Sequence, residues 1–159
     1  MGLLDAIRSK PQPAVARCVN VYASSGDIIV AAMHRNLHGI HYEQDEPLRV
    51  ADAQDAPALG RAFQQAFDRF SIEERNLRDH PRGDWPAWRA SGVGTIDEFE
   101  RRYQLVSCAS VNDANLLVRA SLAHPRDGEV ELAASFNPRQ APRQIGERLL
   151  RLLALARAA

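Results

Sequence analysis

Two amphipathic helix patterns, 86 residues apart, constrain the fold more than any other feature of this sequence. Each begins shortly after a proline with an apolar residue followed by glycine, at Leu59-Gly60 and at Ile145-Gly146. Apolar side chains then recur at the spacing of one helix face. They are Leu59, Phe63, Ala66, Phe67 and Phe70 in the first pattern and Ile145, Leu149, Leu152, Leu153 and Ala156 in the second. We therefore predict helices over residues 57–70 and 143–157, the first capped by Asp55.

A group of short β-strand patterns precedes each predicted helix. In the first half, residues 15–23 and 28–33 flank the polar turn Ser24-Ser25-Gly26-Asp27, which predicts a β-hairpin. Weaker strand patterns follow at residues 39–43 and 48–50. In the second half, strands are predicted at residues 103–111, 115–122 and 129–136, with a turn at 125–128 before the last.

This order predicts an α+β fold, in which an antiparallel sheet of hairpins carries helices packed on one face. The two halves would be pseudo-repeated strand–strand–strand–helix units. Ile29-Val30 and Leu117-Val118, which are 88 residues apart, support that repeat. Both a true duplication and a common architecture without common ancestry explain it.

The chain has 159 residues, which is about the size of one domain. We expect a single domain over 1–159, with an N-terminal segment at 1–13, a first half at 14–70, a long connection at 71–94 and a second half at 95–159. Prolines and glycines interrupt the connection, where only a short helix near 72–78 is expected. The capping-box spacing of Thr95 and Glu98 predicts a further helix over 96–102.

Composition excludes several classes of protein. Twenty basic residues balance twenty acidic ones, which argues against a dedicated nucleic-acid-binding protein. No apolar run approaches the ~20 residues of a membrane span. The N-terminal stretch is interrupted by Asp5 and Arg8 and is not typical of a signal peptide, so we expect a cytoplasmic protein with Cys18 and Cys108 as buried, reduced thiols.

The sequence contains few residues in patterns that indicate catalysis. His34, His38 and His41, with Glu43 close behind, are the densest group of potential metal ligands, but a histidine-rich turn is the simpler interpretation. There is no Gly-rich phosphate loop, His-Glu-x-x-His, Cys-x-x-Cys or Gly-x-Ser-x-Gly motif. We therefore expect no enzyme activity, no catalytic residue, no metal, no cofactor and no small-molecule ligand.

Two charged stretches and one aromatic motif are candidates for binding. The acidic stretch has a net charge of −4 and contains Glu43, Asp45, Glu46, Asp52 and Asp55, against Arg49. A solvated loop that ends in the Asp55 cap is the simplest interpretation, followed by a partner-facing patch and then by a general acid/base pair. The C-terminal stretch has a net charge of +4, from Arg139, Arg143, Arg148, Arg151 and Arg157 against Glu147. Helix-dipole interactions and the covering of apolar surface are a simpler interpretation of those arginines than a nucleic-acid patch, because no aromatic residues alternate with them. Trp85-Pro-Ala-Trp88-Arg89 combines the usual interface anchors, although both rings could instead cap the core.

The order of short motifs resembles a known family. Gly26-Asp-Ile-Ile-Val30, Gly39-Ile40, Glu46-Pro47, Leu59-Gly60, Ala90-Ser-Gly92, Ile96-Asp-Glu-Phe-Glu100 and Ile145-Gly146 occur in this order. Together they are similar to small bacterial immunity proteins of contact-dependent growth inhibition and related polymorphic toxin systems. The resemblance spans about residues 15–157, in pieces of two to five residues.

The resemblance implies an inhibitor that binds the C-terminal domain of a cognate toxin in the cytosol and blocks its active site or substrate surface. From the balanced charge and the lack of a long apolar run, we expect no nucleic-acid or membrane partner. From local charge and aromatic content, we hypothesise a contact surface made of Tyr42, Glu43, Asp45, Glu46, Trp85, Trp88 and Arg89. Two alternatives remain open, which are a secretion chaperone-like binding module and a small metal-dependent hydrolase that uses His34, His38 and Glu43.

Overall fold

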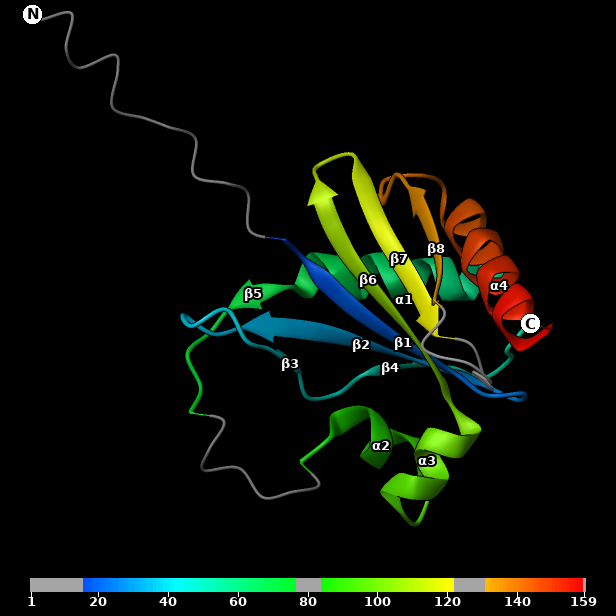
Figure 1. The fold of residues 1–159 in the computed structure, drawn as a ribbon, viewed down its shortest axis with the longest axis horizontal. Helices are drawn as coiled ribbons and strands as arrows, with labels where there is room; N and C mark the ends of the chain where they lie inside the picture. Colours follow the sequence, from blue (N-terminus) through cyan, green and yellow to red (C-terminus); the bar gives the residue numbers. More distant parts are fainter. Residues whose placement is uncertain (1–15, 77–83, 122–130, 159) are drawn as a thin grey trace, which may run out of the picture.

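The computed structural model describes residues 16–76, 84–121 and 131–158. Figure 1 shows a curved sheet with long helices against it and short helices at its lower margin. The strands are β1 (Cys18–Ala23), β2 (Ile28–Arg35), β3 (His41–Glu43), β4 (Leu48–Val50), β5 (Ser71–Ile72), β6 (Gln104–Asn112), β7 (Asn115–Ser121) and β8 (Glu131–Phe136). The helices are α1 (Ala56–Arg69), α2 (Pro86–Ser91), α3 (Ile96–Arg102) and α4 (Pro142–Ala158).

The strands form one eight-stranded sheet in the order β3-β2-β1-β6-β7-β8, and β4 and β5 also pair with β2. Neighbouring strands run antiparallel, except that the two-residue β5 runs parallel to β2. The first strands of the two halves, β1 and β6, pair at the centre, where Val21 lies opposite Val106. The β1–β2 hairpin of the first half lies on one side of this pair, and the β6–β7 hairpin of the second half lies on the other.

The long helices α1 and α4 pack together on one face of the sheet. Alternate strand residues such as Val19, Val21, Val106 and Val118 point to this face, because side chains in a strand alternate between the two faces. They form the main core with the apolar stripes of both helices, including Phe63, Leu59, Ile145 and Leu149. The predicted α+β class and the packing of these two helices on one face are confirmed.

The short helices α2 and α3 pack on the opposite face, which the sequence did not predict. A second apolar cluster joins Tyr22, Ile29 and Ala31 of the sheet to Ala87 and Val93 around α2 and to Phe99 and Tyr103 around α3. Tyr22, Ile29 and Ala31 alternate along β1 and β2 with residues of the main core, so this cluster lies on the other face. Helix α2 itself was missed because six residues are too short to show a periodic apolar face.

The element boundaries agree well with the predictions elsewhere. Asp55 caps α1 by accepting a hydrogen bond from the Ala58 backbone N–H at 2.8 Å, and Thr95 caps α3 by accepting one from Glu98 at 3.2 Å. The short helix expected near residues 72–78 is wrong over the described part of that range, because Ser71–Ile72 pairs with His34 and Arg35 of β2 and residues 73–76 are not helical. Residues 77–78, the N-terminal segment 1–13 and the turn predicted at 125–128 lie outside the described residues.

Candidate protein-binding site

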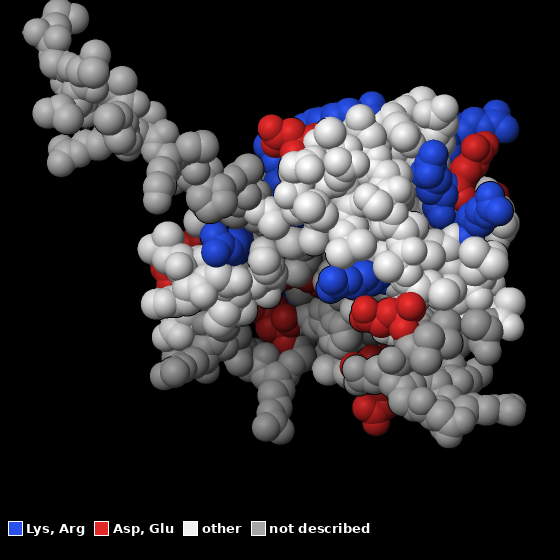
Figure 2. Space-filling model, turned by 45° about the horizontal axis from the view of Figure 1, so that its top comes forward, with Lys and Arg blue, Asp and Glu red and all other residues white. Residues whose placement is uncertain are grey.

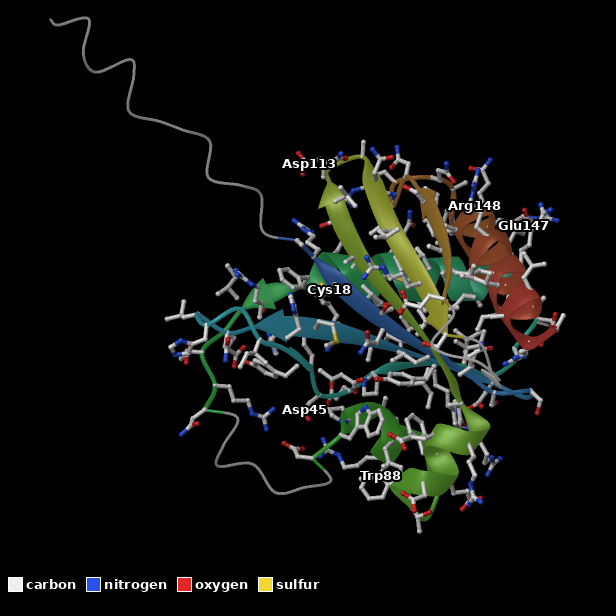
Figure 3. The ribbon with its side chains drawn as sticks, viewed as in Figure 1. Cys18, Asp45, Trp88, Asp113, Glu147 and Arg148 are labelled. Carbon is white, nitrogen blue, oxygen red and sulfur yellow. The ribbon has the colours of Figure 1, made fainter. Side chains whose placement is uncertain are left out.

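The predicted contact residues lie on two segments that meet at α2. Tyr42 and Glu43 belong to β3, and Asp45 and Glu46 follow in the turn before β4. Trp85 directly precedes α2, which contains Trp88 and Arg89. The structure therefore brings together two segments whose nearest residues, Glu46 and Trp85, are 39 positions apart in the sequence, and Figure 3 shows Asp45 near α2, which carries Trp88.

Glu43 is buried and forms the centre of this contact. Its Oε1 accepts hydrogen bonds from the Tyr22 hydroxyl at 2.5 Å and from the Trp85 indole N–H at 3.1 Å. Its Oε2 accepts one from the backbone N–H of Ala87 at 2.9 Å, in the first turn of α2. Burial, together with the negative charge of Glu43, raises the pKa of Tyr22, so the phenol stays protonated as a donor. Glu43 thus fixes α2 to the sheet from inside the protein.

Both tryptophans are partly buried against the second apolar cluster. The Trp85 ring meets Phe99 and Tyr22 edge-on, with ring centroids 5.0 Å and 5.8 Å apart. The Trp88 indole N–H donates to the carbonyl of Val93 at 2.9 Å. The rings therefore cap the core, as one of the two interpretations expected, and each leaves part of its surface in solvent.

A network of ion pairs joins Asp84, which lies just before α2, to Arg89 of α2 and to Asp45 and Arg75 outside the helix. Arg89 pairs with Asp84 and also, at 2.9 Å, with Asp45, whose side chain is 77% exposed. Asp84 also accepts from Arg75 at 2.5 Å. The hydrogen bond from Arg89 is the main reason that the pKa of Asp84 lies below its ordinary value, since the guanidinium stabilises the carboxylate. Neither Arg75 nor Asp84 was predicted as part of the site.

Tyr42 lies on the other face of β3 from Glu43. The strand register pairs Tyr42 with His34 and Glu43 with Met33, so their side chains alternate between the faces. The Tyr42 hydroxyl donates to the carbonyl of Glu73 at 2.9 Å, and the Arg75 guanidinium lies 5.4 Å from the centre of its ring. Because Arg75 also binds Asp84, it links Tyr42 to the network around α2. A basic residue in an irregular segment gives no sequence pattern that indicates this role.

The same register separates the proposed metal ligands. His34 faces the side of Tyr42, where its Nδ1 lies 2.8 Å from the Ser71 hydroxyl and its Nε2 lies 3.4 Å from a Glu73 oxygen. Glu43 faces the opposite side, so His34 and Glu43 cannot bind one metal ion. In residues 16–76, 84–121 and 131–158 there is no group of three or more His, Cys, Asp or Glu side chains that could hold a metal ion.

Solved structures share this fold, although their sequences differ widely from this one. No protein-family model and no curated protein matches the sequence. Among solved structures, a protein of unknown function from Neisseria meningitidis matches with a TM-score of 0.61 and 14% identity, over 94% of this chain and 98% of that one. A chain of the CdiA-CT/CdiI toxin and immunity complex from Yersinia pseudotuberculosis matches with a TM-score of 0.63 and 10% identity, over 87% of this chain and 96% of that one. This chain has their fold.

Of the helices in the described parts of the chain, none is both long and apolar enough to cross a membrane.

Proposed function

We propose that this chain is an immunity protein that binds the C-terminal domain of a contact-dependent growth inhibition toxin and neutralises it. One observation carries the proposal, which is the fold shared with a chain of a CdiA-CT/CdiI complex over 96% of that chain. The order of short motifs in the sequence supports the same family independently of the fold. In this role the protein covers the active site or the substrate surface of the toxin and catalyses no reaction.

The surface around α2 suits such an inhibitor because it is rigid and carries both signs of charge. Buried Glu43 and the two indole hydrogen bonds hold α2 in place, so little conformational freedom is lost on binding. Arg89 and the exposed Asp45 and Glu46 form the charged part of the surface, and the accessible part of Trp88 provides an aromatic anchor. Glu43 and Trp85 act as supports behind it.

A capture experiment followed by a growth assay tests the proposal. The purified chain is immobilised, lysate of the source strain is passed over it in moderate salt, and the retained proteins are identified by mass spectrometry. We expect the C-terminal domain of one large secreted protein at near-equal stoichiometry. That domain is then expressed in a test strain with and without this chain.

The growth assay distinguishes the roles of the two members of a toxin and immunity pair. If the proposal is correct, the captured domain stops growth and co-expression of this chain restores it. Growth arrest caused by this chain alone would assign it the toxin role. Retention of many unfolded proteins by a dimeric form of the chain would support a secretion chaperone instead.

A further inference from the structure

A groove of about 630 Å³ lies between β8, the last strand of the sheet, and α4. It is away from the surface around α2 that contains Asp45, Glu46, Trp88 and Arg89, which we call the α2 surface. Its floor is mostly apolar and includes Leu132 and Phe136 of β8 with Leu152 and Leu155 of α4. The Leu155 side chain is 54% exposed, although it is large and apolar. The groove therefore offers apolar surface that could be buried by a partner.

The α4 side of the groove carries polar side chains along one helix face that ends at Leu155. Gln144, Arg148, Arg151 and Leu155 follow one another at intervals of four, three and four residues, which places them on one helix face. Figure 3 shows Arg148 and Glu147 projecting from the first half of α4, and Figure 2 shows basic side chains with acidic ones between them at the right of the molecule, where α4 lies. Two arginines thus line a groove whose floor is apolar.

The positive charge of these arginines is not balanced by the described residues. Glu147 also lines the groove, but its carboxylate accepts from Arg143 at 2.7 Å. The Arg148 guanidinium lies 5.9 Å from the centre of the Phe136 ring. Within the described ranges, no carboxylate lies within ion-pair distance of Arg148 or Arg151.

The helix dipole does not account for these two arginines. Cations stabilise a helix in its last turn, and in α4 that turn contains Arg157. Arg157 also has a structural role, since it donates to the carbonyls of Ala23 and Ser24 at 2.9 Å and 3.1 Å. Arg148 and Arg151 lie in the middle of the helix and are exposed.

We propose that this groove binds a protein segment that presents an apolar side chain between two carboxylates. The apolar side chain would enter between β8 and α4, against Leu132 and Leu155, and the carboxylates would pair with Arg148 and Arg151. The chemistry follows from the apolar floor and the unbalanced guanidinium groups, which favour acidic over basic partners. This inference goes beyond the proposed function and does not depend on it.

Peptide titration monitored by NMR tests the inference on the full chain. The probe is a capped Gly-Asp-Leu-Glu-Gly peptide, and the matched control is a capped Gly-Lys-Leu-Lys-Gly peptide. We expect the acidic peptide to cause saturable amide shifts confined to β8 and α4, with a Kd on the order of 0.1–1 mM, and the basic peptide to cause none. The double variant R148E/R151E should weaken acidic-peptide binding by roughly tenfold or more.

Arg101→Glu is the control for charge, because Arg101 is exposed on α3, on the opposite face of the sheet. It should leave the peptide affinity unchanged. The inference would be overturned by an absence of saturable shifts, by equal binding of the two peptides, or by an unchanged affinity in R148E/R151E. The comparison of the acidic and basic peptides needs no protein variant, so it tests the inference even if a substitution disturbs folding.

Discussion

Gly60 of α1 and Gly146 of α4 make the same contact with each other's helix. A Cβ on Gly60 would lie 1.7 Å from the carbonyl oxygen of Pro142, and a Cβ on Gly146 would lie 1.9 Å from that of Ala56. Pro142 follows Ala56 by the same 86 residues that separate the two glycines. The contact is therefore reciprocal, and its two sides follow the same 86-residue offset as the pseudo-repeat predicted from the sequence.

The glycine contact predicts that alanine is destabilising at both positions. Gly→Ala inside a helix normally adds about 1 kcal/mol of stability, but here each new methyl would overlap a backbone carbonyl and force the helices apart. We expect Gly60→Ala and Gly146→Ala each to lower the free energy of unfolding by about 1–3 kcal/mol in urea denaturation. Gly94→Ala is the control, because a Cβ there meets nothing within 4 Å.

The double variant tests the reciprocity itself. Once one methyl has separated α1 from α4, the second meets less overlap, so the combined loss of stability should be smaller than the sum of the single losses. Strictly additive losses would show that the two contacts are independent of each other.

Buried Glu43 leads to a second prediction. Glu43→Gln keeps the size of the side chain but turns an amide NH2 toward a donor, so at least one of Tyr22, Trp85 and Ala87 loses its acceptor. We expect a loss of about 1–3 kcal/mol in the free energy of unfolding, with tryptophan fluorescence shifted to the red as α2 loosens. Glu46→Gln, at an exposed position in the next turn, should change neither quantity.

A third prediction concerns acid stability and Asp27, a buried residue in the turn between β1 and β2. Burial alone would raise the pKa of Asp27, but hydrogen bonds from Ser24, Tyr103 and Arg49 outweigh it and hold the pKa below its ordinary value of 3.8. A carboxyl group with a lowered pKa in the folded state stabilises the protein above its ordinary pKa. That stability is lost as the pH falls through the lower, folded-state value.

We therefore expect the free energy of unfolding to fall as the pH drops below 3.8, and Asp27→Asn to reduce this dependence. Urea denaturation of both proteins, from neutral pH into the acid range, measures the difference. The idea fails if the two proteins lose stability in parallel across that range.

The sequence predicts those helices of the fold that are long enough to show several turns of regular apolar spacing. Helices α1 and α4 were predicted within a residue or two, because each shows several turns of regular apolar spacing. The 86-residue offset of Gly60 and Gly146 was visible in the sequence, but the carbonyl that each glycine meets depends on the packing of the helices. Helix α2 has too few residues for periodicity.

The sequence predicted which residues belong to the candidate site but not which of them contact one another. Charge and aromatic content located Glu43 and Trp85, but only the register of β3 and the docking of α2 show that they bond to each other inside the protein. The register of β3 also explains why the metal site suggested by the histidine group does not form around His34 and Glu43. His34 and Glu43 are close in the sequence, yet they lie on opposite faces of the sheet.

A last prediction concerns the association of the proposed toxin with the α2 surface. Asp45 and Glu46 are exposed, so their charges should speed the encounter with a basic partner more than they strengthen the final complex. For the double variant D45N/E46Q, we expect a severalfold lower association rate at low salt, a weaker salt dependence and a nearly unchanged dissociation rate. Surface plasmon resonance with the captured domain over a series of salt concentrations measures all three. The matched control D97N/E100Q makes the same change of charge at exposed positions of α3. If both double variants slow association equally, net charge and not the α2 surface steers the encounter.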